Sequence, residues 1–393
     1  MDRFQINIKS SVIEDLKERI AKTRWTDEID NGNWEHGTNK SYLMELCDYW
    51  QNGFSWKMQE DYLNSFENYK TEIDGIGLHY IFHKGEGKKR IPILLTHGWP
   101  DSFVRFLKII PLLTQADENG LSFDVVVPSI PGYGFSDIPK ELGMNKKMIA
   151  NLFTQLMTNK LGYDKFIAHG GDLGSGVTEQ IGLYASNFVY GLHLTDLPFE
   201  HGIEEPKNAN EEEKKYFEAV KKWEMSEGAY ASIQSTKPQS LSYGLNDSPV
   251  GMASWMIEKF KAWSDNNGNI ESAFTKDELL TNLTIYWATQ TINSSIRIYY
   301  ESVKAIKNSL YNPLAKLNPF DKTGQKSQVP TAFALFPKDI SKPPKSLAER
   351  YFNIVQWTEF SAGGHFGAME QPELLAKDLR KFAEYLQIND SFS

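Results

Sequence analysis

Short apolar runs alternate with amphipathic stretches through the middle of this chain, and this pattern predicts its architecture. The apolar runs are typical of buried strands and lie at 91–95, 123–127, 166–168 and 191–194. Residues 73–82 alternate around Gly75 and Gly77 like a hairpin, and residues 146–161 have helical periodicity. Such alternation is typical of a mostly parallel sheet with helices on both faces, which binds ligands at the carboxyl ends of its strands. We therefore expect an α/β fold.

Helical signals replace this strand pattern after Pro198. Ser248 and Pro249 are typical of a helix start, with proline at the first helical position, and Thr275 and Glu278 have the spacing of a capping box. Strand-like runs return only near the end of the chain, followed by a last amphipathic helix, at 331–336, 354–357 and 373–386. We expect a helical cap that is inserted between two strands of one sheet and covers the edge where ligands bind.

The N-terminal part of the chain has a third pattern. Ser11 and Glu14 predict a capped helix, because Val12, Leu16 and Ile20 then recur at helical spacing. The aromatic residues that follow are interrupted by Asn, Gly and Asp, which favours short helices wrapped over another part of the protein. The expected segments are an N-terminal helical meander, a first part of the sheet core, the cap and a second part of the core, at 1–70, 71–197, 198–328 and 329–393.

Composition narrows the functional classes. A formal net charge of -9 with mixed signs gives no basic stripe, so nucleic acid is not expected as a partner. The only cysteine is Cys47, which excludes an intrachain disulfide and a Cys/His metal cluster and favours a reducing compartment. No apolar run approaches the roughly 20 residues that span a bilayer, and the start does not resemble a signal peptide. We expect a soluble, cytoplasmic protein without a membrane anchor, metal or cofactor. The sequence does not decide whether the protein forms a homo-oligomer.

The stretch from Phe166 to Gly176 has the layout of a strand-to-helix elbow. An apolar run ends at paired glycines, and Gly170, Asp172 and Gly174 follow the pattern G-x-D-x-G. In the G-x-S-x-G elbow, the glycines permit a strained turn that lifts the central side chain above the sheet. Here the lifted group would be the Asp172 carboxylate. The alternative is that Asp172 only N-caps the helix that follows, a position that aspartate favours.

A carboxylate nucleophile restricts the chemistry of this elbow. An acyl group transferred to Asp172 would give a reactive mixed anhydride, whereas an alkyl group gives an ordinary ester that water can cleave. A serine that attacked an alkyl carbon would remain as an inert ether. The elbow therefore favours alkyl transfer from an epoxide or an alkyl halide over esterase chemistry.

Hydrolysis of such an ester needs a base and a group that orients the base. His365 lies in a glycine-rich loop just beyond the last predicted strand, where it would face the elbow. His97 and His169 also end strands, but each precedes a tight glycine turn, where packing and backbone hydrogen bonding are the expected roles. Hydrolases with this elbow have the order nucleophile, acid, histidine, which makes Asp339 the candidate acid. A solvated turn or a helix cap is the alternative for Asp339.

The turn Thr96–Pro100 follows the strand predicted at 91–95 and would bring a backbone N–H towards Asp172. The N–H groups of Trp99 and Leu173 could then hold the oxyanion that forms when water attacks the ester carbonyl. The alternative is an ordinary turn before a helix, in which Trp99 only packs.

This set of residues resembles the microsomal-type epoxide hydrolases, which open epoxides to vicinal diols through an aspartate ester. The resemblance extends over nearly the whole chain, and the matching motifs are Asp15–Ile20 with Thr23–Trp25, His97–Pro100, Gly170–Ser175, Leu245–Gly251 and Gly363–Phe366. It implies the α/β-hydrolase fold, with a lipophilic epoxide and water as the small-molecule partners. It also implies Asp172 as nucleophile, His365 as general base and Asp339 as orienting acid.

The family uses two cap tyrosines as acids that protonate the epoxide oxygen. By motif these are Tyr230 and Tyr299, although periodicity alone does not separate Tyr299 from Tyr300. This chain departs from the family pattern at two places. Membrane-bound relatives begin with a hydrophobic anchor that this chain lacks, and many relatives have glutamate where this chain has Asp339. A shorter acid could orient His365 only if its loop approaches more closely.

Two other functions are compatible with the same residues. Haloalkane dehalogenases share the aspartate nucleophile and the fold, but a halide is a stable leaving anion and requires no tyrosine acid. A non-catalytic small-molecule receptor is the other alternative, because fold alone does not guarantee catalysis. Such a receptor would not need the nucleophile, base and acid, and all three are present in this chain.

Overall fold

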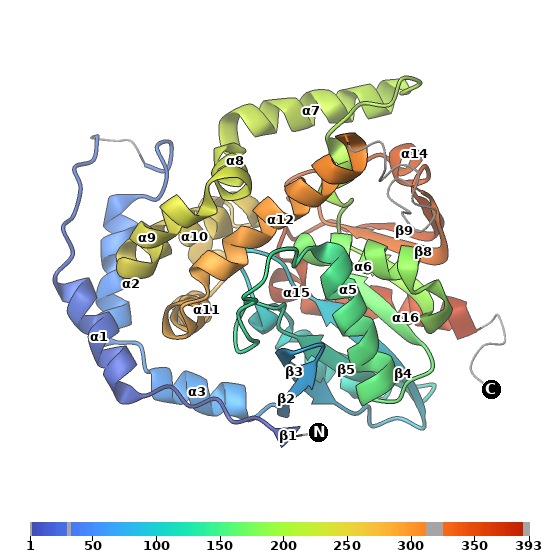
Figure 1. Cartoon of the computed structure of the whole chain (residues 1–393), viewed down its shortest axis with the longest axis horizontal. Coiled ribbons are helices and arrows are strands. Elements are labelled where there is room, and N and C mark those ends of the chain that lie inside the picture. Colours follow the sequence, from blue (N-terminus) through green and yellow to red (C-terminus); the bar gives the residue numbers. More distant parts are fainter. Residues whose placement is uncertain (1, 30–32, 312–324, 388–393) are drawn as a thin grey trace.

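The computed structural model describes residues 2–29, 33–311 and 325–387 of the chain. Their centre is a nine-stranded sheet (Figure 1). The strands follow each other across it in the order β1-β2-β3-β5-β4-β6-β7-β8-β9. Their bounds are β1 (Asp2–Arg3), β2 (Asn68–Ile73), β3 (Ile76–His83), β4 (Lys89–Thr96), β5 (Leu121–Pro128), β6 (Phe166–Gly170), β7 (Val189–Leu194), β8 (Ser327–Leu335) and β9 (Phe352–Glu359).

The sheet has an antiparallel part and a parallel part. β2 and β3 form the predicted hairpin, and Asp74 and Gly75 at its turn both have positive φ, of 50° and 77°. Asp-Gly is a preferred pair for such a turn because both positions must adopt φ above zero. From β5 to β9 the strands are parallel, and every residue of β5 is buried. Strands buried on both faces are near-continuous apolar runs, which is why the sequence predicts them well.

Helices cover both faces of the sheet. On one face, α6 (Leu173–Tyr184) packs on β4, β6, β7 and β8, and α5 (Lys146–Gln155) packs on α6. On the other, α16 (Pro372–Gln387) contacts β7, β8 and α4 (Ile109–Thr114), and α4 contacts β5. This is the doubly wound arrangement that the alternating pattern predicts. Its carboxyl strand ends point towards the helices at the top of Figure 1.

The helices inserted between β7 and β8, here called the cap helices, are α7 (Glu211–Glu227), α8 (Ala229–Thr236), α9 (Pro238–Asp247), α10 (Pro249–Trp263), α11 (Lys276–Thr289) and α12 (Ile292–Tyr311). Two helix starts agree with the sequence prediction. Ser248 accepts the Gly251 N–H, and Thr275 and Glu278 form a reciprocal capping box. Among the described residues, no helix combines the length and the apolar character needed to cross a membrane.

The N-terminal helices connect the sheet edge to the cap helices. They are α1 (Ser10–Ala21), α2 (Lys40–Asn52) and α3 (Trp56–Asn64), drawn in blue in Figure 1. α1 and α2 contact α10 and α11, and the buried Trp50 indole donates to Thr284 of α11 at 2.9 Å. The predicted cap at Ser11 is wrong. The helix begins at Ser10 after Lys9, without a side-chain cap, because Ser11 is already inside the helix and lacks the extended backbone of an N-cap.

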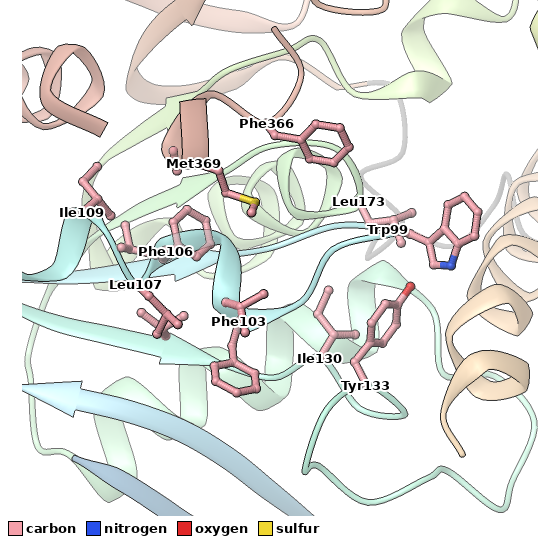
Figure 2. Close-up of a cluster of buried hydrophobic side chains, with 14 of the residues drawn as sticks. Trp99, Phe103, Phe106, Leu107, Ile109, Ile130, Tyr133, Leu173, Phe366 and Met369 are labelled. Atoms are coloured by element: carbon pink, nitrogen blue, oxygen red, sulfur yellow. The ribbon is translucent and has the colours of Figure 1, made fainter. Parts of the chain in front are cut away.

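An apolar cluster lies beneath the turns that follow the strands (Figure 2). Phe103 and Phe106, on a 3₁₀ helix, are fully buried, as is Tyr133. Phe366 and Met369 reach the same cluster from the C-terminal part of the chain. Burial of each large apolar side chain contributes roughly 1.5 to 3 kcal/mol, so this cluster gives the turns above it a rigid base. The remaining short helices are α14 (Lys345–Ala348) and α15 (Gly367–Glu370).

Candidate active site

Asp172 lies on a strained turn between β6 and α6. Its φ of 57° and ψ of -127° fall outside the regions usual for a residue with a side chain. The flanking residues must be glycines, because other backbone segments approach them closely. A Cβ on Gly170 would lie 2.1 Å from the Gly174 carbonyl oxygen, and one on Gly174 would lie 2.1 Å from that of Thr96. Strain of this kind persists only where the surrounding structure holds it, as at functional sites.

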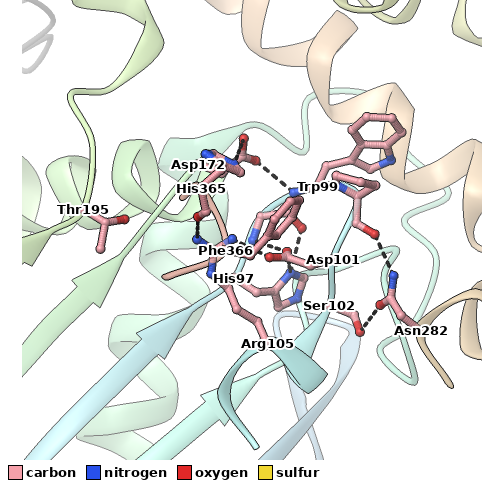
Figure 3. A network of polar contacts seen from close by, with 12 residues as sticks. His97, Trp99, Asp101, Ser102, Arg105, Asp172, Thr195, Asn282, His365 and Phe366 are labelled. Carbon is pink, nitrogen blue, oxygen red and sulfur yellow. Dashed lines mark hydrogen bonds and ion pairs between the residues drawn. The ribbon is translucent and has the colours of Figure 1, made fainter. Parts of the chain in front are cut away.

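The carboxylate of Asp172 does not cap α6, so the N-cap interpretation is wrong. Asp172 occupies the N-cap position, but its side chain makes no capping hydrogen bond. Instead, Oδ1 accepts the Trp99 backbone N–H at 2.8 Å, as Figure 3 shows. The Leu173 N–H also stabilises the carboxylate charge. The turn after β4 and the start of α6 therefore both direct a backbone donor at this side chain.

His365 lies between two carboxylates. Its Nδ1 is 2.7 Å from Oδ1 of Asp339, and its Nε2 is 3.3 Å from Oδ2 of Asp172. The Nε2 contact is an ion-pair distance without hydrogen-bond geometry, so Nε2 has no hydrogen-bond partner among the described residues. The side chains of His365 and Asp339 are each only 3% exposed. The structure thus brings together the three residues expected as nucleophile, base and acid.

The Asp339 loop comes close enough for its short side chain to reach the imidazole. The Lys338 N–H donates to the Gly363 carbonyl at 3.1 Å, and Lys338 forms a parallel β-bridge with Gly364. This backbone pairing joins the loop after β8 directly to the histidine loop after β9. An aspartate at position 339 needs this close approach, because its side chain is one methylene shorter than that of glutamate.

The charges in this group shift each other's protonation. Burial disfavours the imidazolium, but the Asp339 charge and contact with Asp172 outweigh it and raise the pKa of His365 to about 10. Burial likewise favours neutral Asp172, but His365 and the N–H groups of Trp99 and Leu173 outweigh it and lower the pKa of Asp172. In the free protein at neutral pH, Asp172 is therefore anionic and His365 is protonated.

A buried polar network ties the Trp99 turn to the histidine loop (Figure 3). Asp101 accepts the Gly98 N–H at 2.9 Å and forms an ion pair with Arg105. The Arg105 guanidinium also donates to the His365 carbonyl at 2.5 Å. Asn282 of α11 donates to the Pro100 carbonyl at 2.8 Å, which adds a cap helix to the network. Only the position of the turn was predictable from the sequence, and these contacts were not.

Asp196 is a site residue that the sequence reasoning missed. It follows β7, and its Oδ1 accepts the Asp172 backbone N–H at 3.0 Å while Oδ2 accepts the Ser175 hydroxyl at 3.2 Å. Burial, then the nearby Asp339 charge, raise the pKa of Asp196 to about 7. Its place at the carboxyl end of a predicted strand was the one available signal.

Tyr230 of α8 and Tyr299 of α12 line the same cavity as Asp172 and His365, which has a volume of about 890 Å³. Their ring centroids are 6.1 Å apart, and Trp99 stacks on Tyr230 at 5.6 Å. Burial is the main cause that raises the pKa of each phenol, so both stay protonated at neutral pH. Tyr300, which periodicity did not separate from Tyr299, does not line the cavity.

The other strand-end histidines are engaged in the core. His97 Nε2 accepts the Ile130 N–H at 3.1 Å, and the Nδ1 atoms of His169 and His193 are 3.0 Å apart. Packing roles were expected for His97 and His169, and these contacts agree with them. Within the described residues, no group of three or more His, Cys, Asp or Glu side chains is arranged to hold a metal ion.

Comparison with known proteins identifies the family. Residues 1–106 match the family model "Epoxide hydrolase N terminus", and residues 91–241 match "alpha/beta hydrolase fold". Epoxide hydrolase 1 of Sus scrofa is 36% identical over 418 residues, which cover 98% of this chain and 88% of that protein. The chain belongs to the epoxide hydrolase family. The family resemblance and the α/β-hydrolase fold class predicted from the sequence are thereby confirmed.

Solved structures of this family have the same architecture. The crystal structure of juvenile hormone epoxide hydrolase from the silkworm Bombyx mori superposes with a TM-score of 0.84 at 27% identity, covering 99% of this chain and 95% of that one. The Aspergillus niger epoxide hydrolase superposes with a TM-score of 0.83 at 27% identity, covering 98% and 96%. The likeness therefore includes the N-terminal helices and the cap helices as well as the sheet.

Proposed function

We propose that this chain hydrolyses lipophilic epoxides to vicinal diols through a covalent hydroxyalkyl ester on Asp172. One observation carries the proposal: an anionic carboxylate, 13% exposed, stands on the elbow in contact with His365, and two protonated tyrosines line the same cavity. Family membership supports the reaction class.

Ring opening is the first step. An Asp172 oxygen attacks one epoxide carbon, the C–O bond of the ring breaks, and the ring oxygen takes a proton from Tyr230 or Tyr299. Because the attacking oxygen becomes part of an alkyl ester, the carboxylate loses its charge in this step. The phenols act as general acids, since the alkoxide that develops is a much stronger base than a phenolate.

Ester hydrolysis is the second step, and loss of the Asp172 charge prepares it. His365 is held protonated by two carboxylates, and only Asp339 remains charged once the ester has formed. The imidazole then gives up its proton, which returns to the tyrosinate left by ring opening, and the neutral imidazole can accept a proton from water. Water attacks the ester carbonyl, and the Trp99 and Leu173 N–H groups can hold the resulting oxyanion. When this intermediate collapses, the ester C–O bond breaks, the departing diol oxygen takes a proton and the Asp172 carboxylate is regenerated beside protonated His365.

The cavity wall supports a lipophilic substrate. Apolar side chains from the cap helices and from loops of the sheet line it, including Leu197, Phe199, Val220, Trp223, Ile306 and Ile340. Apolar lining with a few converging polar groups is the usual composition of a small-molecule site. Here the converging groups are the carboxylate, the imidazole and the two phenols.

Mass spectrometry of a trapped ester tests the proposal. His365→Gln should accumulate Asp172 carrying the full mass of an added lipophilic epoxide, because ring opening transfers every atom of the substrate. Asp172→Asn is the matched control and should carry none. Wild-type protein that turns over a bromoalkane of the same carbon skeleton and ignores the epoxide would support a dehalogenase instead. A protein that binds both compounds without turnover would indicate a receptor.

A further inference from the structure

We propose that Lys259, on cap helix α10, is a positioning residue that acts through Tyr230 by stabilising the negative charge that builds on this phenol as the epoxide opens. The inference rests on the proposed function, in which Tyr230 is one of two proton donors. It assigns a role to a residue outside the nucleophile, base, acid and phenols described above.

Lys259 is a buried lysine with one side against aromatic rings. The residue is 4% exposed, and Nζ lies 4.6 Å from the Tyr230 ring centroid and 5.8 Å from that of Trp263. Its ion-pair partner is the adjacent Glu258, whose Oε2 is 2.5 Å from Nζ and whose side chain is 22% exposed. Lysine is almost never buried this deeply unless it is paired. Here the pairing satisfies the charge and leaves the ammonium beside the phenol.

The position of this charge matches a need of the reaction. Burial first, and then the Asp172 charge, raise the pKa of Tyr230, which makes its proton harder to give up. As Asp172 becomes an ester its charge disappears, and negative charge moves through the substrate oxygen towards the phenol. A cation held near an aromatic ring attracts the ring more strongly as that ring becomes anionic. Lys259 therefore contributes more in the transition state than in the resting protein, which is the condition for raising the rate.

The electrostatic surroundings make the effect specific to one phenol. Burial, the Asp172 charge and the Glu258 charge raise the pKa of Tyr230, and a hydrogen bond with Tyr299 lowers it. Lys259 also faces Glu227 of α7, whose pKa is raised by burial and by Glu258. Within the described part of the chain, no cationic side chain lies over the Tyr299 ring. We therefore expect Tyr230 to transfer its proton more completely than Tyr299 does.

Single-turnover ester formation measures the effect, with excess protein, acid quench and mass detection of the Asp172 ester. Lys259→Met should slow ester formation by at least about tenfold, the scale of a desolvated cation–π contact, with epoxide affinity nearly unchanged. Lys259→Arg should restore most of the rate. Lys261→Met is the matched control, because this neighbouring lysine of α10 lies over the Trp34 ring at 5.8 Å instead of the Tyr230 ring. It should keep the wild-type rate.

A double-mutant cycle separates this role from simple packing. In a Tyr299→Phe background, Lys259→Met should slow ester formation as much as in the wild type. In a Tyr230→Phe background it should have almost no effect, because the phenol through which it acts is gone. Equal losses in both backgrounds would show that Lys259 only packs against its neighbours and would overturn the inference.

Glu258→Gln gives an independent test that does not depend on the folding of Lys259→Met. It retains the ammonium and removes the carboxylate that neutralises it, so ester formation should become faster. A slower rate in a folded Glu258→Gln protein would overturn the inference. If the wild type formed no ester at all, the proposed function itself would be overturned. This result can be distinguished from failure of the Lys259 inference, because it is seen without any change at residue 258 or 259.

Discussion

The charge of Asp172 is expected to set the proton affinity of His365. Nε2 lies 3.3 Å from Oδ2 without hydrogen-bond geometry, so the two side chains interact mainly through charge. At an effective dielectric constant of roughly 20, two unit charges at this separation attract each other by about 5 kcal/mol. Asp172→Asn keeps the shape of the side chain and removes its charge. It should lower the proton affinity of the imidazole by about 10³- to 10⁴-fold.

The assay is an NMR pH titration of the His365 ring nitrogens. Wild-type His365 should lose its proton at a pKa of about 10, whereas in Asp172→Asn the transition should move towards neutrality, because an imidazolium with one carboxylate fewer is less stable. Asp137→Asn is the control, since this carboxylate pairs with Lys70 and Gly77 at the β2–β3 hairpin. An unchanged His365 transition in Asp172→Asn would refute the argument that ester formation converts this imidazole into a base.

Protein stability gives a second readout of the same contact. Asp339 and Asp172 together raise the folded-state pKa of His365 from 6.5 to about 10, so their contacts stabilise the wild type fully below pH 6.5 and are lost as the pH rises through about 10. Asp172→Asn lacks the part of this contribution that comes from Asp172 and keeps the part that comes from Asp339. The free energy of unfolding of the wild type, relative to Asp172→Asn, should therefore fall across this pH range in denaturant titrations.

Variants at three further places test separate parts of the site. Asp339→Asn should slow ester hydrolysis by about 10²-fold or more in rapid-quench experiments and slow ester formation much less, because Asp339 orients His365 for the second step. Equal effects on both steps would contradict that role. Tyr230→Phe and Tyr299→Phe should each slow ester formation, and the double variant should form almost no ester from an epoxide; wild-type kinetics in the double variant would exclude both as acids. Gly98→Ala would place a Cβ 2.3 Å from Oδ1 of Asp172 and should displace it. Ester formation should fall about 10²-fold with little change in melting temperature, whereas an unchanged rate would show that the carboxylate does not need this position.

The sheet and the starts of several helices could be predicted because their signals are local. Most residues of β4, β5, β6, β7 and β8 are buried, so these strands appear in the sequence as apolar runs. The caps at Ser248 and Thr275 are hydrogen bonds between near neighbours. β1 could not be predicted because an edge strand of two residues has no periodicity, and its strand conformation depends on pairing with β2. The prediction at Ser11 was wrong because its spacing to Glu14 fits a capping box, but Ser11 lies two residues beyond the N-cap position, which Lys9 occupies.

The candidate site could be predicted where a residue's role follows from its own turn. Glycine spacing indicated the elbow at Asp172, and position after a strand indicated His365 and Asp339. Asp196 and Lys259 could not be found in this way. Their importance comes from contacts between residues that are distant in sequence. Asp196 contacts Asp172 where the neighbouring strands β6 and β7 end, and Lys259 contacts Tyr230 where two cap helices meet.

The most direct test of the covalent mechanism follows oxygen atoms through one turnover. Excess wild-type protein reacts with a lipophilic epoxide in water enriched in heavy oxygen. The masses of the diol and of the peptide that contains Asp172 are then measured by mass spectrometry. If the ester forms on Asp172, the second hydroxyl oxygen of the first diol comes from the carboxylate, so the diol is unlabelled and the peptide gains the label. A first diol that carries heavy oxygen, together with an unlabelled Asp172 peptide, would show direct attack of water on the epoxide and contradict the mechanism.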